Sequence, residues 1–329
     1  MKFYLTLLLL STTSAFAQPD QLLTELNPDQ FNREFSDYDP NTALFCGQVS
    51  EMVYWNAKKI EATYQKIITQ YPSTPIRYTF IDYKKSHTQA LLWCTKDFMV
   101  IAFRGTEPSR LRDLITDFKF WNYENHPSQQ EALANMPPGH GGFRRSLMNL
   151  ITEEDLFRQI DELIRNINPA ADLSKFPIYL TGHSLGAAIS QLFIECLQYR
   201  KYNFAGAYHF APPLAVACSM NPYMRETYGK KVYDIINYKD YIARAGRIDV
   251  AHFGKFVRIC DDKKLYYETE SYVKFTKREY MWVLKYHKLA NHLSAIRDPA
   301  NSTANIVTRS VGETPCMGEE IVVVDPCKK

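Results

Sequence analysis

Runs of apolar residues recur along the chain and alternate with segments in which apolar residues have helical spacing. The run Phe98–Phe103 is apolar at nearly every position, which is typical of a central strand buried on both faces. The pattern predicts strands over Tyr78–Tyr83, Gln89–Thr95, Asp97–Phe103, Phe176–Thr181, Phe204–Phe210 and Val232–Asn237. A further hairpin is predicted from Phe256–Cys260 and Leu265–Glu268.

Apolar residues three and four positions apart predict helices between these strands. Such patterns run from Thr42 towards Ile68, from Leu147 to Ile167 with a break near Thr152, from Leu185 to Cys196, and from His287 to Ile296. Strands that alternate with helices predict an α/β fold with a mainly parallel central sheet covered by helices on both faces.

The ends of the chain differ in composition from its middle. Residues 1–17 contain a basic start, a leucine-rich run and a small-residue cleavage site, so they predict a signal peptide and a secreted or periplasmic protein. This run is too short to cross a bilayer, and no later run is long enough. Residues 18–42 are polar and broken by prolines, which predicts an extended lead-in to a single domain over residues 43–300, followed by a tail over residues 301–329.

The charge balance does not indicate a charged partner. Without Lys2, which leaves with residues 1–17, 38 basic residues face 36 acidic ones, a net charge of +2. This balance gives no argument for nucleic-acid binding. An aromatic content of 14% suits a protein that meets apolar or amphiphilic ligands, and it equally suits a large core. The sequence does not specify an oligomeric state.

Seven cysteines in an exported chain permit disulfides, and their odd number leaves at least one unpaired in a monomer. Cys196 lies on the apolar face of a predicted helix and is expected to be a small buried thiol. Cys316 and Cys327 bracket a short apolar run and are the favoured pair for stapling the tail, although spacing leaves other pairings open. No C-x-x-C motif is present, so neither a zinc ribbon nor a thioredoxin-type site is supported.

The segment Gly182–Gly186 has the pattern G-x-S-x-G and lies between a predicted strand and a predicted helix. This is the context of a nucleophile elbow, in which the serine occupies a strained turn and a side chain at either flank would clash with the crossing backbone. A glycine-rich turn that contains a serine by chance is the structural alternative. The flanking strand and helix favour Ser184 as a nucleophile.

A serine nucleophile needs a base and an acid that orients the base, and in sheets of this kind they follow the serine in the order acid, then histidine. Asp240 follows the strand Val232–Asn237 and would lie at the same sheet edge as the elbow. Asp234 alternates inside that strand and is less suitable, and Asp249 is a reserve. Three histidines follow Asp240 along the chain: His252, His287 and His292.

Several segments together resemble the class 3 lipases, the fungal-type triacylglycerol lipases and their phospholipase relatives. The resemblance covers about Phe98 to Arg297 and rests on Ile101–Thr106, Arg112–Phe120, His140–Phe143, Thr181–Gly186, Asn237–Asp240 and Asn291–Ser294. It implies an α/β-hydrolase-like fold and an activity on the carboxylic esters of lipids.

The resemblance also implies roles for individual residues. It makes Ser184 the nucleophile, Asp240 the orienting acid and His292 the base, with an oxyanion hole formed by the backbone amide and hydroxyl of Thr106 and the backbone amide of Leu185. The residues after His292 depart from the family pattern, which usually has an aromatic there, so His287 stays a second choice for the base.

The resulting hypothesis is a secreted serine lipase or esterase that acts through an acyl-enzyme, requires no metal or organic cofactor, and transiently contacts a lipid surface. An acyltransferase that uses the same triad, and a non-catalytic lipid-binding protein, are the alternatives. Residues Leu111–Trp121 have apolar positions at helical spacing directly after the oxyanion segment. They are expected to form either a lid over the acyl pocket or an ordinary helix packed on the core.

Overall fold

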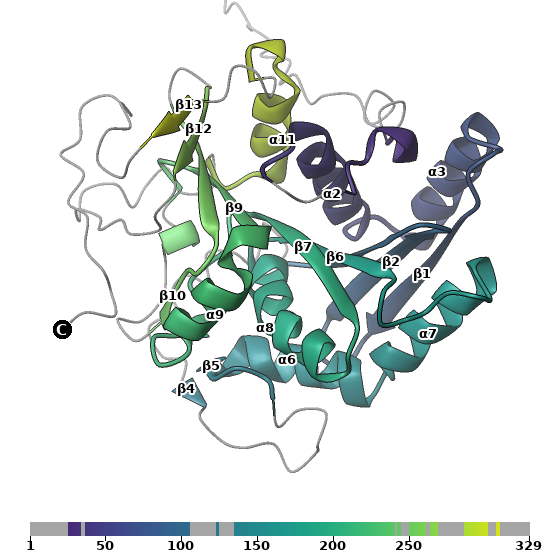
Figure 1. The fold of residues 1–329 in the computed structure, drawn as a ribbon, viewed down its shortest axis with the longest axis horizontal. Coiled ribbons are helices and arrows are strands. Elements are labelled where there is room, and N and C mark those ends of the chain that lie inside the picture. The colour runs from purple at the N-terminus through teal and green to yellow at the C-terminus, as the bar shows by residue number, and fades with distance from the viewer. Residues whose placement is uncertain are drawn as a thin grey trace, which may run out of the picture.

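A main sheet crosses the molecule, and helices cover both of its faces (Figure 1). The structure is a computed structural model that describes residues 26–33, 37–105, 123–124, 135–240, 242–244, 250–260, 264–268, 286–301 and 307–309. The predicted signal peptide, Thr106, the Leu111–Trp121 segment and the reserve acid Asp249 lie outside these residues.

The described strands of the main sheet follow the order β1-β2-β3-β6-β7-β9-β11-β12-β13. Its parallel centre consists of β3 (Met99–Phe103), β6 (Pro177–His183), β7 (Asn203–Phe210), β9 (Val232–Asn237) and β11 (Lys255–Ile259). The edges contain β1 (Ile76–Tyr83) and β2 (Thr88–Thr95), which pair antiparallel, and β12 (Leu265–Glu268), which is antiparallel to β11. The sheet is therefore mainly parallel in its centre, as the alternation of strands and helices predicts.

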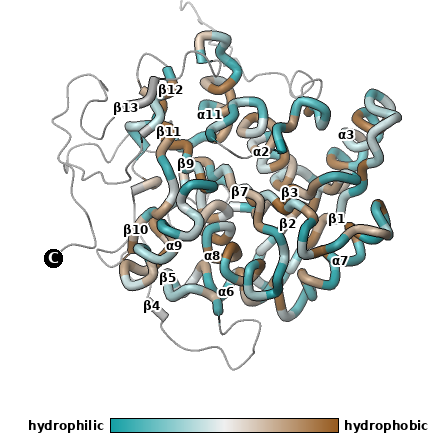
Figure 2. The backbone as a smooth tube through the Cα atoms, viewed as in Figure 1, coloured by the Kyte–Doolittle hydropathy of each residue, from teal (hydrophilic) through white to brown (hydrophobic). Residues whose placement is uncertain are grey.

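Two helical layers enclose the sheet (Figure 1). One contains α2 (Pro40–Met52), α3 (Ala57–Gln70) and α11 (Leu289–Arg297); the other contains α6 (Gly141–Thr152), α7 (Leu156–Ile167) and α8 (Leu185–Tyr199). Successive strand residues point to opposite faces, so Ile101 joins the core under α6, α7 and α8 whereas Val100 joins the core under α2. The edge helices α3 and α7 alternate between hydrophobic and hydrophilic segments, as expected for helices with one buried face (Figure 2).

Some local elements differ from the prediction. The pattern from Thr42 to Ile68 forms two helices, because α2 ends at Met52 and Asn56 caps α3 by accepting a hydrogen bond from the Lys59 amide. A short helix and a small second sheet were not predicted. They comprise α9 (Asn221–Tyr228), β4 (Tyr123–Glu124), β5 (Gly139–His140), β8 (Val216–Ala217) and β10 (Val250–Ala251).

Segments on both sides of residues 43–300 pack with the domain. The expected lead-in contains a short 3-10 helix, η1 (Pro28–Gln30), and Phe31 stacks on Phe98 with ring centroids 4.1 Å apart. In the expected tail, β13 (Val307–Arg309) pairs in parallel with β12 at the edge of the main sheet. The hydrophobic core therefore includes Phe31 from the lead-in, and the main sheet includes a strand from the tail.

Cys46, Cys94 and Cys196 are buried free thiols, which confirms the prediction for Cys196. Cys218 and Cys260 each take part in a disulfide bond. The favoured Cys316–Cys327 pair lies outside the described residues. In the part of the chain that the structure describes, no helix is both long and apolar enough to span a membrane.

Candidate active site

Ser184 occupies the turn between β6 and α8 and has φ 58° and ψ −129°. A positive φ is rare for a residue with a side chain, and such strain is concentrated at functional sites. A Cβ added at Gly182 would overlap the backbone of Gly186, and one added at Gly186 would overlap the carbonyl of Phe103. The prediction that side chains at these flanks would clash with the crossing backbone is confirmed.

The hydroxyl of Ser184 lies at the amino end of α8 and is completely buried. Its backbone amide donates a hydrogen bond of 2.9 Å to the Phe210 carbonyl, which ties the elbow to β7. Among the described residues the hydroxyl has no hydrogen-bond partner. Leu185 is the first residue of α8, and the first amides of a helix have no partner within it and favour negative charge.

Asp240 follows β9 and lies at the carboxyl edge of the sheet, where β6 delivers the elbow. It is completely buried. Its Oδ1 accepts a 2.9 Å hydrogen bond from the Ile242 amide, and its Oδ2 accepts one of 2.8 Å from Nδ1 of His287. The carboxylate is thus held on one side by its own loop and on the other by an imidazole.

His287 precedes α11 and is nearly completely buried. Its ring centroid lies 4.7 Å from that of His183, the neighbour of Ser184 in the chain. Because Nδ1 donates its hydrogen to Asp240, Nε2 carries the lone pair. Nε2 is buried and has no hydrogen-bond partner among the described residues. This arrangement leaves a nitrogen that can accept a hydrogen on a ring that packs against His183.

His292, the base implied by the family resemblance, makes a different contact. It lies within α11, where its Nδ1 donates a 3.0 Å hydrogen bond to the carbonyl of Lys288, four residues earlier. Burial lowers the pKa of His292 to about 4, although the nearby Asp240 carboxylate opposes the shift. The structure therefore pairs Asp240 with His287, the second choice of the sequence, because the helix already satisfies Nδ1 of His292.

A tyrosine joins the elbow to the end of β3. The hydroxyl of Tyr54 accepts a 3.0 Å hydrogen bond from the Gly105 amide and lies 3.4 Å from Nδ1 of His183. Nε2 of His183 lies 2.6 Å from the carbonyl of His287, which can only accept, so Nε2 is the donor and Nδ1 accepts from Tyr54. Burial and two neighbouring histidines, His287 and His292, keep the pKa of His183 well below its usual value. No motif in the sequence indicates this role for Tyr54.

The predicted oxyanion residue Thr106 lies outside the described residues, but its neighbour Gly105 does not. A Cβ added at Gly105 would lie 3.3 Å from Cβ of Ser184 and would overlap the His183 carbonyl. The chain therefore passes against the elbow immediately before Thr106.

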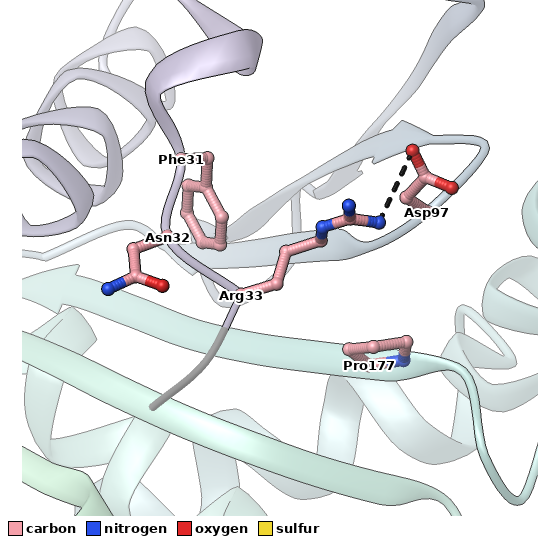
Figure 3. Close-up of a pocket in the computed structure, with 5 residues that line it drawn as sticks. All are labelled: Phe31, Asn32, Arg33, Asp97 and Pro177. Atoms are coloured by element: carbon pink, nitrogen blue, oxygen red, sulfur yellow. Dashed lines mark ion pairs between the residues drawn. The ribbon is translucent and has the colours of Figure 1, made fainter. Parts of the chain in front are cut away.

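A cavity of about 490 Å³ lies elsewhere, at the amino ends of β3 and β6 (Figure 3). Arg33 and Asp97 line it and form a 3.5 Å ion pair, and Pro177 at the start of β6 lies below Arg33 in this view. Ser184 follows the opposite end of β6, so this cavity does not belong to the elbow. Within the described ranges, no group of three or more His, Cys, Asp or Glu side chains could hold a metal ion.

The class 3 lipase family model matches residues 100–249. A solved complex of Rhizomucor miehei lipase with its propeptide is 18% identical, with a TM-score of 0.51, and the match covers 76% of this chain and 77% of that one. Lipase II from Rhizopus niveus is 18% identical, with a TM-score of 0.51 and coverage of 76% and 90%. A lipase from Rhizopus microsporus var. chinensis is 16% identical, with a TM-score of 0.50 and coverage of 84% and 87%. A search of curated proteins found no match.

The fold is α/β-hydrolase-like, as the sequence predicted, and it shares its architecture with these fungal lipases. The match of residues 100–249, which include the elbow and Asp240, supports a class 3 lipase family. This match supports the hydrolysis of lipid esters.

Proposed function

We propose that this chain is a serine hydrolase of lipid carboxylic esters in which Ser184 is the nucleophile, His287 the base and Asp240 the orienting acid. The observation that carries the proposal is the 2.8 Å hydrogen bond between Asp240 and His287, whose ring centroid lies 4.7 Å from that of His183, the residue before Ser184. A nucleophile, a base and a group that orients the base are the three parts that activate a serine. His287 takes the place that the family resemblance gave to His292.

In this mechanism Nε2 of His287 removes the proton of Ser184 as the serine oxygen attacks the ester carbonyl. Asp240 holds the ring in the required tautomer and stabilises the imidazolium that forms. The amides of Leu185 and Thr106 would stabilise the oxyanion, a contribution worth about 10²–10³ in rate for each donor in comparable sites. The imidazolium then protonates the leaving alcohol, and water repeats the cycle to release the fatty acid.

The proposed substrate class, a lipid ester, is supported by the family of residues 100–249. Contact with a lipid surface and a lid formed by Leu111–Trp121 belong to the same proposal. So does export through a signal peptide over residues 1–17, which would place the mature protein in the periplasm or outside the cell.

Product analysis with Ser184→Ala tests this function. Wild type should release free fatty acid from an emulsified triacylglycerol or from phospholipid vesicles, and it should react with a fluorophosphonate probe. Ser184→Ala should do neither. Ser50→Ala is a matched control, because the hydroxyl of Ser50 on α2 is also completely buried and without a partner in the described part of the chain.

Full release of fatty acid by Ser184→Ala would refute the proposed nucleophile. In the presence of added alcohol, a new ester as the main product would instead identify an acyltransferase. Lipid binding by a wild-type protein that neither reacts with the probe nor releases product would identify a non-catalytic binding protein.

A further inference from the structure

A second serine–histidine–aspartate cluster lies beneath the elbow helix. The hydroxyl of Ser190 on α8 lies 2.8 Å from Nε2 of His209 on β7, and Nδ1 of His209 lies 3.1 Å from Oδ1 of Asp234 on β9. The other oxygen of Asp234 lies 3.3 Å from Nδ1 of His252, which follows β10. From the sequence, Asp234 was only a less suitable acid and His252 only one of three histidines that follow Asp240.

The order of contacts resembles a hydrolase triad, but the location excludes catalysis. Ser190, His209 and Asp234 are completely buried, between the sheet and α8. A substrate carbonyl cannot reach the hydroxyl of Ser190 in this position. The cluster therefore acts on its surroundings and not on a substrate.

One branch of the cluster leads to the acid of the proposed triad. Nε2 of His252 donates a 2.7 Å hydrogen bond to the carbonyl of Ala243 in the 3-10 helix η3 (Ile242–Arg244). The first residue of η3 is Ile242, whose amide donates to Oδ1 of Asp240. A continuous series of contacts thus runs from Asp234 through His252 and η3 to Asp240. Ser190 and His209 lie on the other side of Asp234, away from this path.

The charge of the Asp234 carboxylate adds to the contacts of this branch. Both nitrogens of His252 face oxygen atoms: Nε2 lies 2.7 Å from the Ala243 carbonyl, and Nδ1 lies 3.3 Å from the Asp234 carboxylate. Burial alone would raise the pKa of Asp234, but contacts with His209 and His252 outweigh it and lower this pKa to about 2. The carboxylate is therefore ionised in the folded protein.

Gln191, His209 and Arg225 also face the pair of Asp234 and His252. Nε2 of Gln191 on α8 donates to Oδ1 of Asp234 at 3.3 Å, and the ring of His209 lies between Asp234 and the hydroxyl of Ser190. From α9, the Arg225 guanidinium contacts the backbone carbonyl of His252 at 3.4 Å. The Asp234 carboxylate thus lies against the rings of both His209 and His252.

We propose that Asp234 and His252 are positioning residues for the triad: the buried pair fixes η3, and η3 fixes the Asp240 carboxylate against His287. The inference rests on the proposed function. Loss of the pair would let Asp240 shift, and a displacement of about 1 Å in a catalytic arrangement costs on the order of 10²-fold in rate.

The test compares variants on the two branches of the cluster. His252→Phe removes both contacts and keeps a ring, His252→Gln restores a donor for Ala243, and Asp234→Asn removes the charge at constant volume. Ser190→Ala is the matched control on the branch that does not lead to η3. Each variant is assayed for kcat and KM on a soluble short-chain ester, corrected for the folded fraction. The low-field proton resonance of the Asp240–His287 hydrogen bond is recorded as well and assigned by its loss in His287→Gln.

We expect His252→Phe and Asp234→Asn to lower kcat by about 10- to 100-fold with KM within about twofold, and to shift or broaden the low-field resonance. His252→Gln should have a higher kcat than His252→Phe. The kcat of Ser190→Ala should stay within about twofold of wild type. If His252→Phe does not fold, Asp234→Asn and His252→Gln decide the outcome.

An unchanged kcat and resonance in Asp234→Asn, or an equal loss in Ser190→Ala, would overturn the inference. These outcomes are distinct from failure of the proposed function, in which Ser184→Ala itself would remain active.

Discussion

Replacing the two histidines near the elbow one at a time separates the role of the base from that of a buried structural ring. The variants are His287→Gln and His292→Gln, because glutamine keeps polarity and approximate volume but cannot accept the serine proton. In the structure only His287 contacts Asp240, at 2.8 Å, whereas Nδ1 of His292 contacts the Lys288 carbonyl at 3.0 Å.

The expected magnitudes differ by several orders. Loss of a triad member lowers kcat by about 10⁴-fold or more, which corresponds to roughly 5.5 kcal/mol of barrier. His292→Gln removes one neutral hydrogen bond of α11, worth about 1 kcal/mol of stability. We therefore expect His287→Gln to lose about 10⁴-fold in kcat, and His292→Gln to stay within about threefold of wild type where the protein is folded.

The assay is the initial rate on a soluble p-nitrophenyl ester, with the folded fraction measured by circular dichroism and the reactivity of Ser184 measured by fluorophosphonate labelling. Labelling should be slow in His287→Gln and nearly normal in His292→Gln. The opposite result, an active His287→Gln and an inactive, folded His292→Gln, would refute the assignment and restore the base that the family resemblance implied.

Three further outcomes follow from the contacts around the elbow. Tyr54→Phe leaves the Gly105 amide without its acceptor, and we expect kcat/KM to fall about 10-fold. Tyr64→Phe is the control, because it removes a 3.0 Å hydrogen bond from a hydroxyl to a carbonyl far from the elbow. Its kcat/KM should stay within about twofold of wild type. Gly186→Ala forces a methyl group against the β3 backbone and should lower the free energy of unfolding by about 3 kcal/mol. Equal activity and stability in wild type and variant would contradict this expectation. Burial lowers the pKa of His292 from 6.5 to about 4, so unfolding takes up a proton between these values and stability falls by about 3 kcal/mol as the pH drops through that window. Urea unfolding at pH 7 and pH 4.5 should show this loss of stability in wild type and a smaller loss in His292→Gln. An equal loss of stability with pH in the two proteins would count against the role of His292.

Features that depend on neighbouring residues were predictable from the sequence. The elbow needs a strand, a strained turn and a helix within a few residues, and Gly182–Gly186 supplies all three locally. The central strands were predictable as well, because a strand buried on both faces is apolar at nearly every position. Short elements such as α9 and β8 were missed, because they contain too few residues to show a period and form only against the rest of the fold.

The sequence by itself determined the fold class, the elbow with Ser184, and the position of Asp240 after a strand that ends at the same sheet edge. Only the tertiary structure decided which histidine contacts Asp240. His287 and His292 are five residues apart, so their positions in the chain do not distinguish them. The start of α11 distinguishes them. His292 lies inside the helix and donates its Nδ1 hydrogen to a carbonyl four residues earlier, whereas His287 precedes the helix and donates its Nδ1 hydrogen to the Asp240 carboxylate. The buried pair of Asp234 and His252 likewise depends on β9 and the segment after β10 meeting beneath α8, a long-range contact that no local pattern encodes.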